Sequence, residues 1–413
     1  MRRISEADIA RWDAEDPLAA HRQRFDLPPT TVYLAGNSLG ALPKATKARL
    51  DAVVADEWGR SLISGWNTAG WVDLPRRVGD RIAPLIGAEP GEVIVADSTS
   101  VNLFKLAAAA LKLNPSRRRL VTEEGNFPTD LYVLGGLADC LGNGVELDIV
   151  PRDEIVDAID QSTALVVLTH VHYASGAMFD MEALTRTAHE AGAFVLWDLC
   201  HSAGVMPLHL DRVGADFAVG CGYKYLNGGP GAPSFLFVAE RHLARFENPV
   251  AGWFGHRRPF EFAETYEPAP GIERALCGTP AILALVALDE GTKMFADIDL
   301  AAVRSKSTKL TEVFAHLVRQ ECDGWGLTLA SPARAEDRGS QICFKHDDAN
   351  AVMRALAARD VVGDFRAPDI MRFGFSPLYV RFGDVWRAVS ELRVILETQA
   401  WRKAEYQVVA RVT

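Results

Sequence analysis

The amino-acid sequence predicts an α/β protein with two domains, a large one built on a mostly parallel central sheet and a smaller α+β one. The first observation is an alternation of short, continuously apolar runs with helical segments across the middle of the chain. Strands that are apolar along their whole length are typical of parallel sheets covered by helices on both faces. The second is a change after about residue 290, where long amphipathic segments flank a few short strands. With 413 residues, the chain is long enough for two substantial cores.

Residues 1–55 are predicted to form an N-terminal segment that packs on the small domain. The pattern indicates a helix at 4–16, a proline-rich link at 27–29, a short strand leading into a turn rich in glycine and asparagine at 31–43, and an amphipathic segment from residue 44.

The large domain is predicted to span residues 56–290. Its first stretch, 64–75, is expected to be a loop, and it carries two tryptophans, Trp66 and Trp71. The helices that follow are expected at 75–87, 101–113, 129–142, 153–160 and 181–192. The strands are expected at 93–97, 118–125, 145–151, 164–173, 193–199, 215–222 and 233–239.

The small domain is predicted to span residues 291–413. One long amphipathic helix is expected within 297–326, with further helices at 350–360 and 382–404. Short strands are expected at 341–346, 361–366 and 369–377.

Composition excludes several classes of function. A net charge of -10 and a pI near 5.5 argue against a nucleic-acid partner or an anionic membrane surface. The basic cluster at 117–119 is better explained as a solvated helix end than as a binding patch. The six cysteines show no CxxC spacing, so they indicate neither a disulfide framework nor a zinc site, and they fit a reducing cytoplasm. No apolar run approaches the ~20 residues that span a bilayer, and the N-terminal stretch is too acidic for a signal peptide.

Chemically capable side chains follow the predicted strands, at the edge where ligands bind in open α/β sheets. Hydroxyls and free N–H groups at the start of helix 101–113 suit a phosphate, although plain helix capping explains them as well. An aromatic ring and a carboxylate open the helix at 129, and a threonine, a carboxylate and a histidine follow two other strands. These residues are Ser98, Thr99, Ser100, Phe127, Asp130, Thr169, Asp198 and His201.

Lys224 ends the apolar run FAVGCGY, directly before a glycine-rich turn. Partial desolvation would lower the pKa of its amine and favour Schiff-base formation. An isolated lysine at a strand end would more often just reach the solvent. His170 and His172 alternate on one face and suggest a metal pair, but no third ligand lies at nearby spacing, so no metal site is predicted.

Together these residues match the requirements of pyridoxal 5'-phosphate (PLP). The cofactor needs a carboxylate to keep its pyridine nitrogen protonated, a ring to stack on, a phosphate cradle and a lysine for the aldimine. The order of these residues and their positions at strand ends make the prediction, because no single one is decisive.

The sequence resembles the kynureninase family of the fold type I, PLP-dependent aminotransferase superfamily, over most of its length. The resemblance lies in YLAGNSLG, STSVNLFK, NFPTD, DLCHSAG, GYKYLNGGPG, GWFGH, CGTPAI and MRFGFSPLYVRF. GYKYLNGGPG and GWFGH are specific to the family in combination, whereas DLCHSAG is shared with cysteine desulfurases.

The resemblance implies roles for individual residues. Lys224 would hold the internal aldimine and move the Cα proton, and Asp198 would pair with the pyridine nitrogen. Phe127 would stack on the ring, and Arg372 would grip the substrate carboxylate. The phosphate would be held by Thr99, Ser100 and Tyr223, with Trp253 and Thr279 reaching over from a second subunit; Asp130, Thr169 and His201 would complete the cofactor site, and Asn37, Ser38 and Trp66 would bind substrate.

The implied reaction is hydrolysis of L-kynurenine to anthranilate and L-alanine, in tryptophan catabolism and the kynurenine pathway that leads to NAD biosynthesis. Tyr223 is a candidate for proton transfer at the carbonyl, and phosphate binding alone is an equal alternative. Thr279 stands where animal relatives have asparagine, which favours kynurenine over 3-hydroxykynurenine. Trp66 and Trp71 would line the same aromatic pocket or pack at the interface of a homodimer.

Three other functions remain as alternatives. A cysteine desulfurase would need a mobile reactive cysteine, but Cys322 and Cys343 lie in a predicted helix end and a strand. A class V aminotransferase shares the superfamily. A non-catalytic regulator would usually carry a DNA-binding module, for which the sequence leaves no room.

Overall fold

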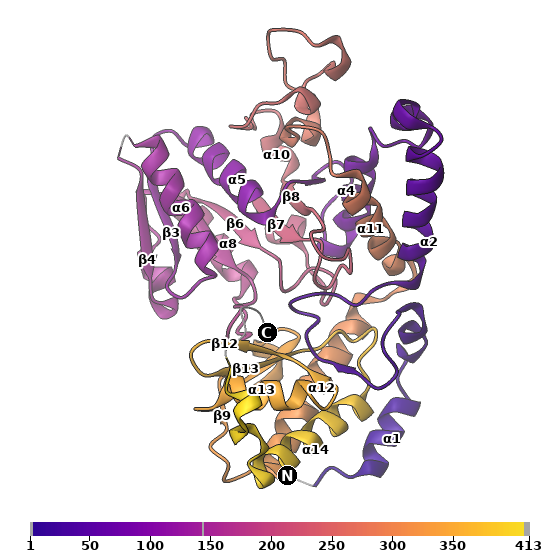
Figure 1. Ribbon diagram of the computed structural model, residues 1–413. Coiled ribbons are helices and arrows are strands. Elements are labelled where there is room, and N and C mark those ends of the chain that lie inside the picture. The colour runs from indigo at the N-terminus through magenta and orange to yellow at the C-terminus, as the bar shows by residue number, and fades with distance from the viewer. Residues whose placement is uncertain (1–2, 143, 409–413) are drawn as a thin grey trace.

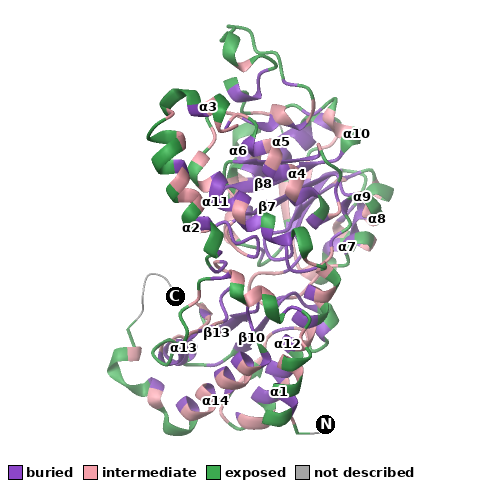
Figure 2. Cartoon of the chain, turned by 90° about the vertical axis from the view of Figure 1, so that its right-hand side faces the viewer, coloured by how far each residue is buried: buried purple, intermediate pink, exposed green. Residues whose placement is uncertain are grey.

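The computed structural model describes residues 3–142 and 144–408, which form two bodies, one above the other in Figure 1. The large body is built on a seven-stranded sheet and the small body on a four-stranded sheet. Each has its own layer of buried residues, as the purple segments in Figure 2 show. Both predicted architectures, the mostly parallel sheet and the α+β unit, are therefore present.

The sheet of the large body has the order β2-β8-β7-β6-β5-β3-β4. All neighbours from β7 to β4 run parallel, and only β8 is antiparallel to both of its partners. The C-terminal ends of the six remaining strands therefore lie at one edge. The strands are β2 Val93–Ala96, β3 Arg119–Glu123, β4 Glu146–Val150, β5 Thr163–Thr169, β6 Phe194–Asp198, β7 Phe217–Cys221 and β8 Ser234–Val238.

Both faces of this sheet are covered, as the apolar strands predict. Along β2, Val93 and Val95 join one core while Ile94 and Ala96 join the other, because successive side chains of a strand point to opposite faces. The first core includes α4 (Leu74–Ile86), α8 (Met181–Ala191) and α11 (Ile282–Lys293); the second includes α5 (Thr99–Leu113) and α6 (Pro128–Leu141). Each fully buried aliphatic side chain contributes roughly 1.5–3 kcal/mol to folding.

The small body packs a four-stranded antiparallel sheet, order β12-β13-β10-β9, against helices. Its strands are β9 Thr328–Leu329, β10 Gln341–Lys345, β12 Asp364–Arg366 and β13 Ile370–Gly374. Its helices are α12 Leu300–Glu321, α13 Ala349–Ala357 and α14 Phe382–Thr398. The helical and strand segments predicted after residue 290 are thus confirmed as element types.

The N-terminal residues contact the small body. Helix α1 (Glu6–Ala14) lies along α14, and β1 (Val32–Tyr33) pairs in parallel with β11 (Val361–Val362). Helix α2 (Lys44–Ala52), extended by a π-helical turn at Val53–Trp58, instead packs on α11 of the large body. We therefore propose that the chain crosses between the bodies after β1, before the predicted boundary at residue 55.

Three local predictions were wrong. The stretch expected to be a loop forms a 3-10 turn at Leu62–Ser64 and the one-turn helix α3 (Gly65–Thr68). The helix predicted at 153–160 is only a single turn, α7 (Ile155–Ala158), because Ile159 leaves the helical region at ψ 113°. Apart from these corrections, the structure has two short helices that were not predicted, α9 Leu210–Val213 and α10 Glu240–Leu243.

The basic cluster at 117–119 is not a helix end, which is the third correction. Helix α5 ends at Leu113, and the cluster lies at the start of β3. The Arg117 guanidinium donates to the carbonyls of Ala191 (2.6 Å) and Thr163 (3.1 Å). Arg119 pairs with Asp148 and Asp160. These two arginines therefore link the start of β3 to β4, to the start of β5 and to the end of α8. In the described part of the chain, none of the helices is long and apolar enough to cross a membrane.

Candidate active site

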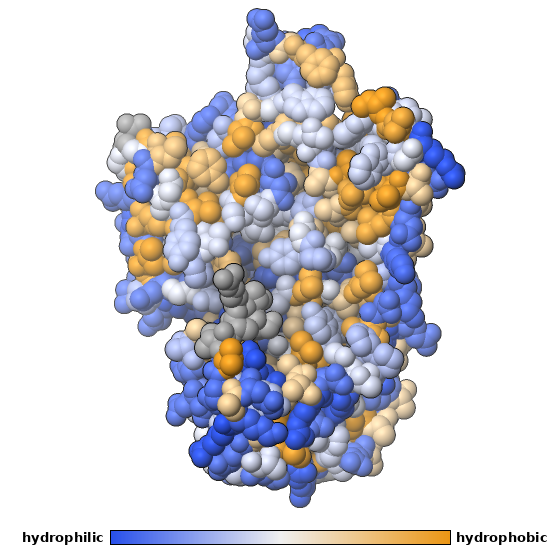
Figure 3. All heavy atoms as spheres, in the orientation of Figure 1, coloured by the Kyte–Doolittle hydropathy of each residue, from blue (hydrophilic) through white to orange (hydrophobic). Residues whose placement is uncertain are grey.

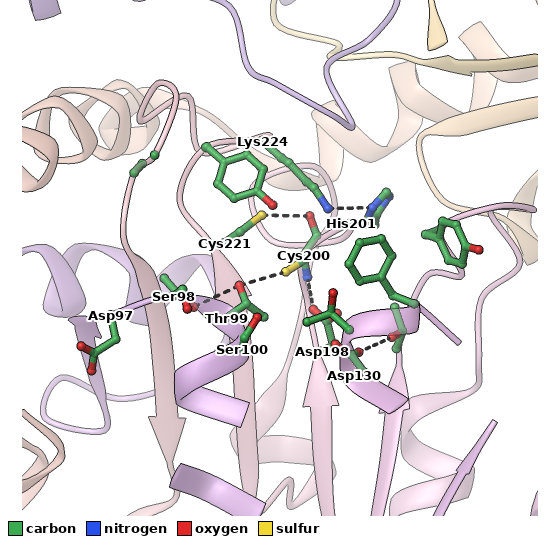
Figure 4. Close-up of a pocket in the computed structure, with 18 residues that line it drawn as sticks. Asp97, Ser98, Thr99, Ser100, Asp130, Asp198, Cys200, His201, Cys221 and Lys224 are labelled. Carbon is green, nitrogen blue, oxygen red and sulfur yellow. Dashed lines mark hydrogen bonds between the residues drawn. The ribbon is translucent and has the colours of Figure 1, made fainter. Parts of the chain in front are cut away.

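A cavity of about 440 Å³ lies at the C-terminal edge of the seven-stranded sheet, where the sequence predicts the ligand site. Figure 4 shows its walls, which come from the segments that follow β2, β3, β5, β6 and β7. Ten of the candidate residues from the sequence line it: Ser98, Thr99, Ser100, Phe127, Asp130, Thr169, Asp198, His201, Tyr223 and Lys224. The parallel strand order brings together residues that are more than a hundred positions apart in the sequence.

The N-terminus of α5 forms one wall of the cavity. Ser98 is the N-cap, and its hydroxyl accepts a hydrogen bond from the backbone N–H of Val101 at 3.4 Å. The capping interpretation is therefore correct for Ser98. The Thr99 hydroxyl donates to the Ser234 hydroxyl at 3.3 Å and lines the cavity together with Ser100. The positive end of a 15-residue helix dipole and its free N–H groups meet the cavity here, an arrangement that suits a phosphate.

Two buried carboxylates, Asp130 and Asp198, lie at the floor of the cavity. Asp198 accepts the backbone N–H of Cys200 at 2.7 Å. Burial, and after it the charge of Asp198, raise the pKa of Asp130 well above its ordinary value, although Lys224 opposes the shift. Two adjacent carboxylates in a desolvated site favour a further cation beside them, and a protonated heterocyclic nitrogen would supply one.

We expect Asp130→Asn to stabilise the cofactor-free protein at neutral pH by about 1–2 kcal/mol, because an amide needs no cation when buried. The native carboxyl holds its proton more tightly than the unfolded chain does, so native stability falls as pH rises above the ordinary pKa of 3.8 towards the raised native pKa. The gain should therefore be larger at about pH 8 than at about pH 4 in urea unfolding.

Asp139→Asn is the matched control for this variant, because Asp139 lies on the same helix α6 and is exposed. The control should leave the free energy of unfolding unchanged at both pH values. If the difference in unfolding free energy between Asp130→Asn and wild type is the same at both pH values, ionisation of Asp130 does not destabilise the native protein.

Lys224 extends into the cavity towards His201, as Figure 4 shows, with Nζ 2.9 Å from His201 Nε2. Lys224 is partly buried and His201 is buried. Burial, the charge of Lys224 and that of Arg372 lower the pKa of His201 well below its ordinary value. His201 is therefore a neutral imidazole at physiological pH, able to accept a hydrogen bond from the lysine.

Tyr223 lies beside the lysine and keeps its proton. Burial, followed by the nearby thiols Cys221 and Cys200, raises the pKa of its phenol. The group can therefore donate a hydrogen bond or a proton across the neutral pH range, which either of its two predicted roles requires.

Phe127 and Thr169 occupy the wall that follows β3 and β5. Phe127 is 44% exposed and makes a T-shaped contact with Tyr173, with ring centroids 5.3 Å apart, so exposed aromatic surface lies in the cavity wall. The Thr169 hydroxyl donates to Asn126 Oδ1 at 2.6 Å and lies 3.5 Å from an oxygen of Asp130.

The predicted carboxylate-binding residue, Arg372, lies next to the cavity but not in its wall. Its guanidinium forms a bidentate ion pair with Asp364, Nε to Oδ1 at 2.6 Å and Nη2 to Oδ2 at 2.5 Å. It also donates to the Ser38 hydroxyl and to the carbonyl of Tyr173, each at 2.7 Å. Arg366 lies 3.3 Å from the same Asp364, so the cluster has two arginines for one carboxylate and attracts an anion.

Asn37 and Ser38 reach this region because their turn lies against the lysine segment. The N–H of Gly40 donates to the carbonyl of Tyr223 at 2.8 Å. A Cβ at residue 40 would come within 2.2 Å of the Lys224 carbonyl oxygen, so only glycine permits the approach. Asn37 is fully buried.

The remaining predicted site residues do not line the cavity of this chain. Trp66 packs against Trp71 and Phe254, with ring centroids 5.7 and 6.0 Å away. Trp71 is buried and donates to Glu57 at 2.9 Å, so within one chain both tryptophans pack in the large body, and their place at the aromatic pocket or the dimer interface stays a prediction. Trp253 and Thr279 are exposed.

The two histidines considered for a metal lie in different surroundings. Burial lowers the pKa of His170 to about 4. His172 Nε2 lies 2.8 Å from the carbonyl of Gly125, and its Nδ1 lies 3.0 Å from the Ser175 hydroxyl. Among the residues that the structure describes, no cluster of three or more His, Cys, Asp or Glu side chains is placed to hold a metal ion.

Several residues at the site were not predicted from the sequence. Cys200, Cys221, Tyr173 and Ser234 line the cavity, and each follows or begins a strand that the analysis had located. Strand-end position was therefore a usable signal for them. Gln341, which contacts His201 at 3.0 Å, also begins a strand, but this strand belongs to the small body, so its position gave no sign that the residue reaches the cavity.

Two solved structures superpose on nearly the whole chain. A variant of the cystine C–S lyase C-DES with glycine linked to its PLP cofactor matches with a TM-score of 0.78 and 15% identity, over 90% of this chain and 98% of that one. The apo cysteine desulfurase of Thermococcus onnurineus NA1 matches with a TM-score of 0.74 and 19% identity, over 96% and 99%. This likeness defines the fold, which is fold type I of the PLP-dependent enzymes.

Relatives in sequence define the family. The kynureninase of Burkholderia pseudomallei (strain 1106a) is 51% identical over 407 residues, which cover 97% of this chain and 98% of that protein. The kynureninase of Pseudomonas fluorescens is 51% identical over 411 residues, covering 98% and 99%. A family model of the kynureninase C-terminal domain matches residues 303–392. The chain belongs to the kynureninase family.

Proposed function

We propose that this protein is a PLP-dependent hydrolase that cleaves the Cβ–Cγ bond of L-kynurenine to give anthranilate and L-alanine. The observation that carries the proposal is the cavity itself, where Lys224, Asp198, Phe127 and the N-terminus of α5 converge. The near full-length identity of 51% to named kynureninases supports the choice of substrate. The desulfurase alternative has only the likeness in fold to support it.

The residues of the cavity fit PLP. When bound, PLP supplies an electron sink for the proton removal at Cα and for the cleavage of the Cβ–Cγ bond. Asp198 would keep the pyridine nitrogen protonated, and Asp130 beside it shares the need for a cation. Thr99 and Ser100 would hold the phosphate at the helix start, and Phe127 would stack on the ring.

Lys224 would carry the proton that leaves Cα. Its amine lies 2.9 Å from the neutral His201, which can hold the released amine in place and does not compete for the proton. Tyr223, whose raised pKa keeps it a phenol, would donate to the γ-carbonyl oxygen as water adds to that carbon. The arginine cluster at Arg372 and Arg366 would orient the substrate carboxylate.

The function is tested by adding L-kynurenine or 3-hydroxykynurenine to purified protein with PLP, and following product fluorescence. We expect anthranilate and alanine in equal amounts, with kcat/KM for kynurenine at least about tenfold higher than for 3-hydroxykynurenine, since a pocket contact of this kind is worth about 1–3 kcal/mol. Cysteine is added in a parallel reaction. If sulfide is released from cysteine and kynurenine is not turned over, the protein is a cysteine desulfurase and the proposal is wrong.

We further propose that two copies of the chain form a homodimer that completes each site. Trp253 and Thr279 lie on the surface, outside the cavity of their own chain. Apart from Val408, the exposed large hydrophobic residues of the described chain all fall between residues 42 and 283. In Figure 3 the orange residues accordingly gather on the upper, large body, while the small body is mostly blue. Such a surface suits a partner subunit.

A hybrid dimer tests which subunit supplies Trp253. Lys224→Ala chains and Trp253→Ala chains are each expected to be impaired alone. After unfolding and refolding together, the hybrid would contain one site with Lys224 from one subunit and Trp253 from the other, so activity should recover towards about half of wild type per mixed dimer. If Trp253 serves its own chain, mixing will restore nothing. Refolded single-variant samples are the controls.

A cytoplasmic location and a place in tryptophan catabolism complete the proposal. All six cysteines are free, which fits a reducing compartment.

A further inference from the structure

Gln341, on β10 of the small body, is buried and held in one orientation. Its Nε2 donates to the carbonyls of Tyr173 at 2.9 Å and His172 at 3.3 Å. Carbonyl oxygens can only accept, so the amide nitrogen must face them and Oε1 must face the other way. There Oε1 accepts the amide N–H of Asn37 at 2.9 Å and lies 3.0 Å from His201 Nδ1.

The fixed orientation of this amide determines where the imidazole of His201 carries its proton. Oε1 has no hydrogen to give, so a hydrogen bond requires the proton on Nδ1 of His201. Burial and the positive charges of Lys224, Arg372 and Arg366 lower the pKa of His201; when Lys224 is a neutral amine, burial and the two arginines still favour the neutral imidazole. Its Nε2 therefore presents a lone pair to the amine of Lys224, 2.9 Å away.

We propose that Gln341 is a positioning residue for the reaction: it selects the Nδ1–H form of His201 and so orients the amine of Lys224. A neutral amine that donates one proton to Nε2 keeps its own lone pair directed away from the histidine, free to take a proton from the substrate. The opposite tautomer would leave a bare Nδ1 against Oε1 of Gln341, and its Nε2–H would donate to the lone pair of the amine, which could then not take a proton from the substrate. The inference rests on the proposed role of Lys224 as proton carrier.

The surroundings of Gln341 permit little movement. A Cβ at Gly176 would come within 2.9 Å of Gln341 Cγ, and one at Gly374 within 2.0 Å of Asn37 Oδ1. Asn37 comes from the N-terminal segment, Gln341 from the small body and His201 from the large body. The three-residue contact therefore joins the N-terminal segment, the small body and the large body directly beside the lysine.

The test compares Gln341→Met, which keeps the length but removes the acceptor, with Gln320→Met. Gln320 lies on α12, and both ends of its amide are likewise bonded, to the backbone of Ile4 at 2.8 and 3.0 Å. In the full-length chain without PLP, ¹⁵N spectra of histidine side chains, assigned with His201→Gln, should show Nδ1–H for wild type and for Gln320→Met. Gln341→Met should show a mixture or the Nε2–H form.

With PLP and kynurenine, Gln341→Met should lower kcat about 10- to 100-fold and shift the pH profile of kcat, while KM changes less than about threefold. Gln341→Glu keeps an acceptor facing His201 and should raise the titration midpoint of His201 in the cofactor-free protein. This variant provides the test if Gln341→Met does not fold. An unchanged Nδ1–H signal in Gln341→Met, or an unchanged midpoint in Gln341→Glu, would overturn the inference. Because these spectra need no turnover, they test it separately from the kynureninase activity.

Discussion

Lys224→Ala is expected to abolish anthranilate formation, with kcat reduced by at least about 10⁴-fold, because both the covalent attachment of PLP and the proton carrier are lost. The visible absorption band of the PLP-loaded protein should disappear with it. The fold should persist, since Lys224 is only partly buried and its one short polar contact is with His201.

Two controls separate loss of chemistry from loss of structure. Lys112→Ala removes an exposed lysine whose ion pair with Glu247, at 3.3 Å, is solvated, and it should leave kcat and the spectrum unchanged. Added ethylamine should restore part of the activity of Lys224→Ala by supplying the missing amine in the cavity. Turnover within tenfold of wild type in the alanine variant would rule out Lys224 as the reactive lysine.

Arg372→Met is expected to lower the free energy of unfolding by about 3 kcal/mol, because it leaves the buried carboxylate of Asp364 without its bidentate partner. Burial alone would raise the pKa of Asp364, but Arg372 outweighs it and holds that pKa below its ordinary value of 3.8. The contribution is therefore present above the ordinary pKa and is lost as pH falls through the lowered native pKa.

A double variant separates stability from substrate binding. Arg372→Met with Asp364→Leu removes both charges, so most of the stability should return in urea unfolding, while KM for kynurenine stays raised at least about tenfold. If the double variant has a normal KM for kynurenine, Arg366 alone binds the substrate carboxylate. If the double variant is as unstable as the single one, the ion pair is not the source of the loss.

The arginine cluster shows which part of a site a sequence motif can locate. The motif MRFGFSP identifies Arg372 but not Asp364, which lies eight residues before it on the neighbouring strand β12. The guanidinium fork that would bind a substrate carboxylate is already engaged in the structure. Only the second arginine, Arg366, gives the cluster its surplus positive charge.

The sequence by itself determined the architecture and most of the cavity. A strand that is buried on both faces appears in the sequence as a continuous apolar run. Strand β5 is an example, because every one of its residues is buried whichever way it points. Ligand groups follow strand ends in such sheets, so the position of Asp198 or Lys224 in the sequence already located it at the cavity.

Only the tertiary structure decided which distant residues meet. Gln341 contacts His201 across 140 positions and Asn37 across 304, and no periodicity links such pairs. Trp66 gives the same aromatic signal whether it lines a pocket or packs in a core, and only the structure shows that it packs on Trp71 within the chain. Local patterns record whether a residue is buried, whereas its partner depends on how separate elements dock, which is set by the sum of many long-range contacts.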